Sequence, residues 1–129
     1  MILGIGTDLV DIQRIEKLIE SSEFISKIFT DNEITKSNNI TDKKKKASYF
    51  AKRFSAKEAF SKALGTGFGE VLAFKDIEIL NNEKGAPYFN ISDNIDCYIK
   101  EFHNINSYEV HLSLTDEYPY AQSFVILSK

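Results

Sequence analysis

The stretch from Phe50 to Gly69 constrains the fold most, because its composition predicts one long helix with a defined end. It is rich in Ala, Lys, Glu, Phe and Leu, contains no Pro, and is followed by Gly65 and Gly67 as stop signals. At 100° per residue, small and apolar residues form one broad face, made of Ala56, Ala59, Phe60, Ala63 and Leu64. We therefore expect this helix to be the central element of the molecule.

A narrow polar stripe remains on this helix. Ser55, Glu58 and Lys62 follow one another at i, i+3 and i+7, so a carboxylate and an ammonium lie side by side. One interpretation is an exposed ion pair, which stabilises a helix by only about 0.3–0.5 kcal/mol. The other is a walled site in which Glu58 binds a metal ion and Lys62 neutralises an anion. The stretch alone leaves both interpretations open.

The first ten residues form a short apolar run that predicts a buried strand. With a period of two, Gly4, Gly6 and Asp8 share one face of this strand. Two glycines on one face indicate either close packing of another backbone or close approach of a ligand to Asp8. Both readings stay open at this point.

Asp11 then caps a predicted helix whose outer side carries Arg14 and Lys17. Thr41 or Asp42 caps the long helix. The other predicted elements are a helix over 23–29, a helix opened by the Thr30–Glu33 capping box, strands over 75–80, 87–91, 108–115 and 121–127, and a helix capped by Ser92 or Asp93. This order predicts an α+β fold, with a largely antiparallel sheet packed against the long central helix and shorter helices.

The length of 129 residues predicts a single domain over 1–129, and a hydrophobic content of 43% is enough for a packed core. Cys97 is the only cysteine, which excludes an intramolecular disulfide and a multi-cysteine zinc site. Any metal ion is therefore expected to be bound by oxygen. The sequence has no apolar run of about 18 residues and no leader pattern, so we expect a cytoplasmic protein that does not enter a membrane.

The net charge of −3 argues against a protein that binds nucleic acid over its whole surface. The basic residues are nevertheless concentrated in one segment, which contains Lys43, Lys44, Lys45, Lys46, Lys52, Arg53 and Lys57. Four lysines in the first helical turn oppose the helix dipole. The run is either a solvated, frayed end or an arm that reads phosphate.

Two motifs carry a family resemblance. The segment from Gly4 to Asp8 with Arg14 behind it, and the segment 54–67, together resemble the holo-acyl-carrier-protein synthases, which are small bacterial 4′-phosphopantetheinyl transferases. The resemblance continues through Gly85-x-Pro87 and the segment 110–117, so it spans nearly the whole chain. Some members carry Ser-His where this chain has Thr-Asp at 115–116, so no role is assigned to a histidine there.

The resemblance implies transfer of 4′-phosphopantetheine from coenzyme A to a serine of an acyl carrier protein, with release of adenosine 3′,5′-bisphosphate, in fatty acid biosynthesis. It implies that Asp8 and Glu58 bind Mg²⁺, a metal that favours one or two carboxylates together with substrate phosphates. Lys62 would stabilise charge on the pyrophosphate or on the leaving phosphate. Either Glu58 or a metal-bound water could take the proton of the serine.

The same resemblance implies a set of coenzyme A contacts. Lys44 is the first choice for the 3′-phosphate, and Arg53 and Lys57 are the alternatives. The other predicted contacts are Gly65, Pro87 and His111.

The resemblance also implies partners. Acyl carrier proteins are acidic, so Arg14 and Lys17 are predicted to dock the carrier. The family implies a homotrimer with a coenzyme A cleft between neighbouring chains, the hairpin around Pro87 and His111 coming from the chain next to the one that supplies Glu58. The alternative is a monomer whose own helices cover the sheet.

Competing functions are a nucleotide or phosphate-binding module and, last, a nucleic-acid adaptor.

Overall fold

The computed structural model describes residues 1–129. Its elements in chain order are β1 (Ile2–Asp11), α1 (Ile12–Leu18), α2 (Ser22–Ile28), α3 (Asp31–Ser37), α4 (Lys43–Leu64), the 3-10 turn η1 (Phe74–Asp76), β2 (Ile77–Asn81), β3 (Pro87–Ile91), α5 (Asp93–His103), β4 (Glu109–Glu117) and β5 (Tyr120–Ser128). The predicted helices and strands are all present. The first two residues of the strand predicted over 75–80 belong to η1, and the strand itself is β2.

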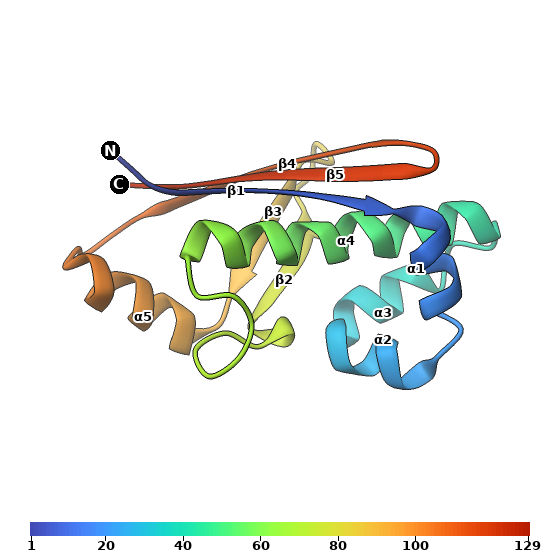
Figure 1. The fold of residues 1–129 in the computed structure, drawn as a ribbon, viewed down its shortest axis with the longest axis horizontal. Coiled ribbons are helices and arrows are strands. Elements are labelled where there is room, and N and C mark those ends of the chain that lie inside the picture. Colours follow the sequence, from blue (N-terminus) through green and yellow to red (C-terminus); the bar gives the residue numbers. More distant parts are fainter.

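The strands form two antiparallel sheets, one of order β1-β5-β4 and one made by the β2-β3 hairpin. Figure 1 shows α4 running lengthwise along one face of the three-stranded sheet, with α1, α2 and α3 gathered at one end and α5 at the other. No helix covers the opposite face of that sheet in this view. The α+β architecture with a central helix is confirmed. None of the helices is long and apolar enough to cross a membrane.

The predicted helix ends are found where the capping residues stand. Asp11, Asp42 and Ser92 each accept a hydrogen bond from the first turn of α1, α4 and α5, and Thr30 opens α3 with a complete capping box. Gly65 ends α4 in the left-handed conformation, with φ of +86°. These local signals set the length and direction of α4 independently of tertiary contacts.

The glycine face of β1 packs directly against α4. A Cβ atom at Gly4 would lie 1.9 Å from the carbonyl oxygen of Ala63, and one at Gly6 would lie 1.9 Å from that of Ala59. Any side chain there would push the strand off the helix. Close backbone packing is therefore the reason for both glycines, and it brings the Asp8 end of β1 against the second half of α4.

The other face of β1 is open, so the prediction of a fully buried strand is wrong for that face. Ile5, Leu9 and Phe124 are 59%, 63% and 44% exposed on β1 and β5. Tyr120 on β5 and His111 on β4 are also exposed. We call this side the open sheet face. An isolated chain rarely leaves so many large apolar residues of one sheet in water.

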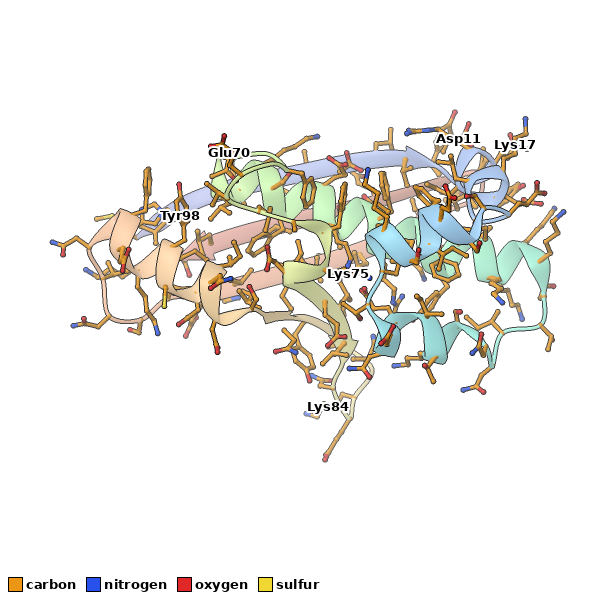
Figure 2. The ribbon with its side chains drawn as sticks, turned by 90° about the horizontal axis from the view of Figure 1, so that it is seen from below. Asp11, Lys17, Glu70, Lys75, Lys84 and Tyr98 are labelled. Atoms are coloured by element: carbon orange, nitrogen blue, oxygen red, sulfur yellow. The ribbon has the colours of Figure 1, made fainter.

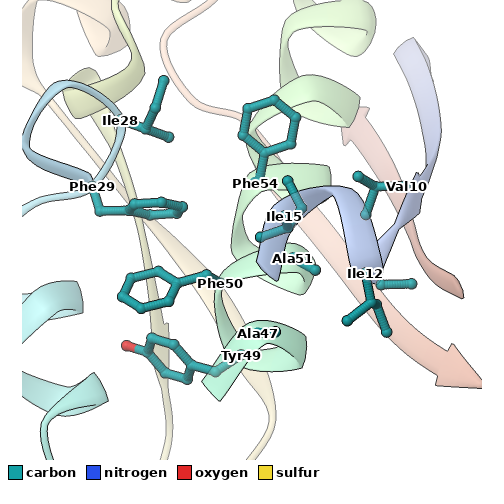
Figure 3. Packing of buried hydrophobic residues seen from close by; sticks show 11 residues of the cluster. Val10, Ile12, Ile15, Ile28, Phe29, Ala47, Tyr49, Phe50, Ala51 and Phe54 are labelled. Atoms are coloured by element: carbon teal, nitrogen blue, oxygen red, sulfur yellow. The ribbon is translucent and has the colours of Figure 1, made fainter. Parts of the chain in front are cut away.

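The core packs around α4. At the α1–α3 end, Phe50 lies between Phe29 and Tyr49, and Figure 3 shows Ile12 and Ile15 of α1 meeting Ala47 and Ala51 across the helix. A second cluster joins the other half of α4 to β5 and α5. Because α4 is enclosed on most sides, several of its polar residues also lie inside the protein.

Candidate active site

Three charged side chains meet where β1 crosses α4, and we call them the acid corner: Asp8, Glu58 and Lys62. The ammonium of Lys62 donates to the carbonyl oxygen of Thr7 at 2.8 Å and lies 3.4 Å from Oδ1 of Asp8. Lys62 thus pairs with the strand, and the predicted ion pair with Glu58 on the same helix is not formed. Glu58 and Lys62 of the polar stripe thus lie near Asp8, at the end of the glycine face of β1. The walled-site interpretation requires this arrangement.

Two buried serines hold this crossing in place. Ser55 Oγ donates to the carbonyl oxygen of Asp8 at 2.9 Å and lies 2.7 Å from Ser123 Oγ on β5. Ser55 had been placed in the polar stripe, and it is fully buried. It fixes the backbone of Asp8 relative to α4, a role that only the tertiary contact reveals.

The electrostatics of the corner centre on Glu58. Burial raises the pKa of Glu58 above its usual value, and the negative charge of Asp8 raises it further. The positive charges of Lys62 and Arg14 act in the opposite direction. The dominant effects therefore disfavour the ionised form of Glu58, which is the expected state of a carboxylate whose compensating cation comes from outside the chain.

The donor set of the corner fits a hard divalent cation. Asp8 and Glu58 offer two carboxylates, close enough that the charge of Asp8 raises the pKa of Glu58, with no cysteine or histidine beside them. Mg²⁺ is bound in proteins by one or two carboxylates, and substrate phosphates complete its coordination. A cation between these groups would also relieve the repulsion that raises the pKa of Glu58.

A second site lies at the other half of α4, in a cleft of about 470 Å³ that we call the basic cleft. Its lining includes two of the predicted coenzyme A contacts, Lys44 and Arg53. The remaining lining residues are Ile12, Lys45, Ser48, Tyr49, Lys52, Asp116 and Tyr118. Four cations against one carboxylate make this cleft a place for an anion.

Arg53 is the unusual residue of the basic cleft. It is buried, it has no carboxylate partner, and its guanidinium lies over the Tyr49 ring at 3.7 Å. Its Nη atoms donate to the Tyr49 carbonyl oxygen at 3.4 Å and to Asn81 Oδ1 at 3.1 Å, while Nε has no partner. Burial lowers the pKa of Arg53 below its usual value, and although the charge of Glu33 acts in the opposite direction, no carboxylate contacts the guanidinium. Arg53 is therefore a candidate to bind an anionic ligand.

The β4–β5 turn closes the basic cleft, and the sequence reasoning missed its contribution. Asp116 accepts a hydrogen bond from Ser48 Oγ at 2.7 Å and lies 3.6 Å from the ammonium of Lys52. Lys44 lies over the Tyr118 ring at 4.7 Å. These contacts join residues about 70 positions apart, so no local pattern could have indicated them.

Lys57 needs a correction. It had been named as an alternative phosphate contact, but its side chain is fully buried and its ammonium has four oxygen partners. These are Glu33 Oε1 at 2.8 Å and the carbonyl oxygens of Ile28, Phe74 and Ile77 at 2.9, 3.0 and 2.9 Å. Lys57 joins α4 to four other elements, α2, α3, η1 and β2, and has no hydrogen left for a ligand.

The other predicted coenzyme A contacts lie apart from the acid corner. Gly65 is exposed at the end of α4, one turn beyond Lys62. Pro87 opens β3, and His111 lies on the open sheet face, 3.3 Å from Ser128 Oγ. Pro87 and His111 make no hydrogen bond or ion pair with the acid corner of their own chain.

The two predicted docking residues are both exposed on α1. Figure 2 shows Lys17 beside Asp11 at the end of the molecule where β1 enters α1. Arg14 lies near enough to the acid corner for its charge to act on Glu58. We call Arg14 and Lys17 the basic rim: Arg14 lies near the acid corner, whereas Lys17 lines a hollow together with Lys43 and Lys44.

The acid corner and the basic cleft lie at different points along α4: Arg53 turns away from Glu58, whereas Lys44 points to nearly the same side of the helix but starts about 21 Å further along its axis. Arg53 and Glu58 are five residues apart, which turns the second about 140° from the first around the helix axis. Rotation about the helix axis at Arg53 and distance along the axis at Lys44 thus separate the two sites within one chain. A hollow of about 340 Å³ beside Lys62, lined also by Ile5, Thr7 and Phe124, leads from the acid corner onto the open sheet face.

Comparison with known proteins agrees with this geometry. The profile of the 4′-phosphopantetheinyl transferase superfamily matches residues 4–122. The holo-acyl-carrier-protein synthase of Pelagibacter ubique is 46% identical over 128 residues, which cover 99% of this chain and 98% of that protein. The crystal structure of the synthase from Neisseria meningitidis matches with a TM-score of 0.87 at 35% identity and covers 100% of both chains.

A further solved structure, a synthase from Bacillus anthracis in complex with CoA (3′,5′-ADP), matches with a TM-score of 0.84 at 34% identity, over 100% of this chain and 98% of that one. The similarities confirm the resemblance drawn from the two sequence motifs. The chain belongs to the 4′-phosphopantetheinyl transferase superfamily, among the holo-acyl-carrier-protein synthases.

Proposed function

We propose that this chain transfers the 4′-phosphopantetheine group of coenzyme A to a serine of an apo acyl carrier protein and releases adenosine 3′,5′-bisphosphate. The observation that carries the proposal is the acid corner, in which Asp8, Glu58 and Lys62 converge from two elements. Relatives that match almost the full length are named for this activity.

Asp8 and Glu58 would hold Mg²⁺ against the pyrophosphate of the donor. When bound, the ion supplies Lewis acidity and neutralises negative charge on the phosphates. Lys62, whose ammonium is held by the carbonyl oxygen of Thr7, would stabilise the charge that develops on the leaving phosphate. The serine oxygen forms a bond to the phosphorus that carries pantetheine, and the bond from that phosphorus to the bridging oxygen breaks.

The serine must lose a proton as it attacks. Glu58 is a half-buried carboxylate of the acid corner and forms no hydrogen bond or ion pair with Lys62, so an oxygen of it can take up a proton. We propose Glu58 as the group of this chain that receives the proton. Arg14 and Lys17 on the neighbouring rim would attract the acidic carrier and direct its serine to the corner.

The basic cleft would hold the 3′-phosphate of the donor through Arg53 and Lys44. Because α4 separates this cleft from the acid corner of its own chain, we propose that one donor uses the corner of one subunit and the cleft of its neighbour. The open sheet face, with Ile5, Leu9 and Phe124 exposed, offers the apolar surface for a homotrimer. His111 and the hairpin with Pro87 would then belong to the neighbouring side of the site.

A single assay tests the proposed reaction. The protein is incubated with coenzyme A, Mg²⁺ and an apo acyl carrier protein, and the carrier is weighed by mass spectrometry. The carrier is expected to gain the mass of one phosphopantetheine arm. Binding of coenzyme A without any mass gain in a competent carrier would instead identify a binding module.

A further inference from the structure

The side chain of Asn81, at the end of β2, joins the basic cleft to the β2–β3 hairpin. Its Oδ1 accepts a hydrogen bond from Arg53 Nη2 at 3.1 Å and one from the Lys36 ammonium at 3.3 Å. Its Nδ2 donates to the carbonyl oxygen of Gly85 in the hairpin turn at 3.1 Å. The carboxamide is therefore oriented by two cations on its oxygen and a carbonyl on its nitrogen.

The guanidinium of Arg53 has few other restraints. It has five N–H donors, and only two bonds to the protein hold it, of which the bond to Tyr49 is the longer at 3.4 Å. The Tyr49 ring supports one face of the guanidinium but leaves it free to turn in its own plane. The Asn81 oxygen is the restraint that sets this in-plane direction.

We propose that Asn81 is a positioning residue that aims Arg53 into the basic cleft and so determines the preference for a donor with a 3′-phosphate. This inference rests on the proposed function of the cleft. Asn81 does not line the cleft, so it acts through Arg53 and not by touching the donor. The same contact holds Arg53 in register with the turn before Pro87, so both elements on that side of the site are set together.

The test compares two donors, coenzyme A and 3′-dephospho-coenzyme A, in Asn81→Ala, Arg53→Met and the unaltered protein. The Asn81 variant is expected to lose about tenfold in kcat/KM for coenzyme A, the effect of one hydrogen bond to a charged group. Its kcat/KM for the dephospho donor should stay unchanged, which also shows that the variant is folded. Asn82→Ala is the matched control.

Asn82 shapes the same turn, since its Oδ1 accepts from the backbone N–H groups of Lys84 and Ala86 at 2.9 and 3.0 Å, but it does not touch Arg53. Figure 2 shows Lys84 at the projecting tip of this hairpin. Asn82→Ala should therefore keep the preference between the two donors. An equal loss for both donors in Asn81→Ala would reduce Asn81 to a structural role and overturn the inference.

A second measurement separates this inference from the proposed function. Binding of adenosine 3′,5′-bisphosphate and of AMP is measured by calorimetry, without any transfer. If Arg53→Met leaves the preference between these ligands unchanged, the phosphate role of the cleft is wrong and the inference falls with it. If Arg53→Met abolishes the preference and Asn81→Ala does not lower it, only the inference is overturned.

Discussion

The acid corner and the basic cleft are built on the same helix, yet they leave opposite charges for a ligand. At the corner, burial and then the charge of Asp8 raise the pKa of Glu58, and Lys62 pairs with Asp8. In the cleft, Arg53 is buried without any carboxylate partner. A donor with phosphates in two places can therefore be held through a cation at one end and directly at the other.

Lys57 is a second buried cation on the same helix, and unlike Arg53 it is paired within the chain. It follows Arg53 by one turn and precedes Glu58 by one residue, and it is saturated by Glu33 and three carbonyl oxygens. Lys57, whose charge is paired with Glu33, is therefore structural, whereas Arg53, which no carboxylate contacts, is the one of the two that can bind an anion.

Replacing Lys57 should give the largest effect on stability. Lys57→Met strands the buried Glu33 carboxylate, and breaking a buried pair in this way costs about 3–5 kcal/mol in the free energy of unfolding. Urea denaturation measures the loss. Lys57→Met combined with Glu33→Gln should recover part of it, because the uncompensated charge is then gone. A single variant as stable as the unaltered protein would contradict the structural role of Lys57.

Replacing a corner carboxylate should affect turnover without unfolding. Glu58→Gln and Asp8→Asn keep the shape of the side chain but remove a cation ligand, and each is expected to lower transfer about 100-fold or more. The loss should be equal for coenzyme A and its dephospho form, because the corner does not contact the 3′-phosphate. Near-native turnover at low Mg²⁺ in either variant would show that the metal assignment is wrong.

Much of the fold follows from local signals in the sequence. The capping residues at Asp11, Thr30 and Ser92 start helices where predicted, because a cap satisfies backbone groups of its own first turn. Gly65 ends α4 for an equally local reason. That the glycine face of β1 is covered and the face with Ile5 and Leu9 is open could not be foreseen, since an apolar run of strand length does not tell which face is covered.

The site was only partly predictable. The glycine track and the polar stripe point to Asp8, Glu58 and Lys62, because both patterns are periodic. The different roles of Lys57 and Arg53 could not be read from the sequence pattern. They depend on Glu33, which pairs with Lys57, and on the absence of a carboxylate in contact with Arg53. Helical periodicity gives the direction of a side chain but not its partner from a distant segment.

The pH dependence gives a finer test of the corner. The pKa of Glu58 is raised first by burial and then by Asp8, so the carboxyl keeps its proton to a higher pH and binds a cation better as pH rises through that pKa. Asp8→Asn removes the second cause and should lower the pKa of Glu58. Carbon-13 NMR of the side-chain carboxyl, titrated without divalent cation, measures the change. An unchanged or higher pKa of Glu58 in Asp8→Asn would show that the charge of Asp8 does not act on Glu58.

The smallest effect is expected at the rim. Arg14→Glu reverses a charge on α1 that is proposed to attract the acidic carrier, and it should raise KM for the carrier a few-fold, by about 1 kcal/mol. KM for coenzyme A should stay the same, because Arg14 does not line the basic cleft. Steady-state kinetics with each substrate varied in turn measures both values. Equal changes in both would remove the docking role.

The central claim is that one donor uses the acid corner of one chain and the basic cleft of another. Chains carrying Glu58→Gln are refolded together with chains carrying both Lys44→Glu and Arg53→Met, and transfer is assayed at coenzyme A below KM. Mixed assemblies should be more active than the sum of the two parents, since some interfaces then pair an intact corner with an intact cleft. Sedimentation as a monomer, or no recovery in verified mixed assemblies, would show that each chain builds its site alone.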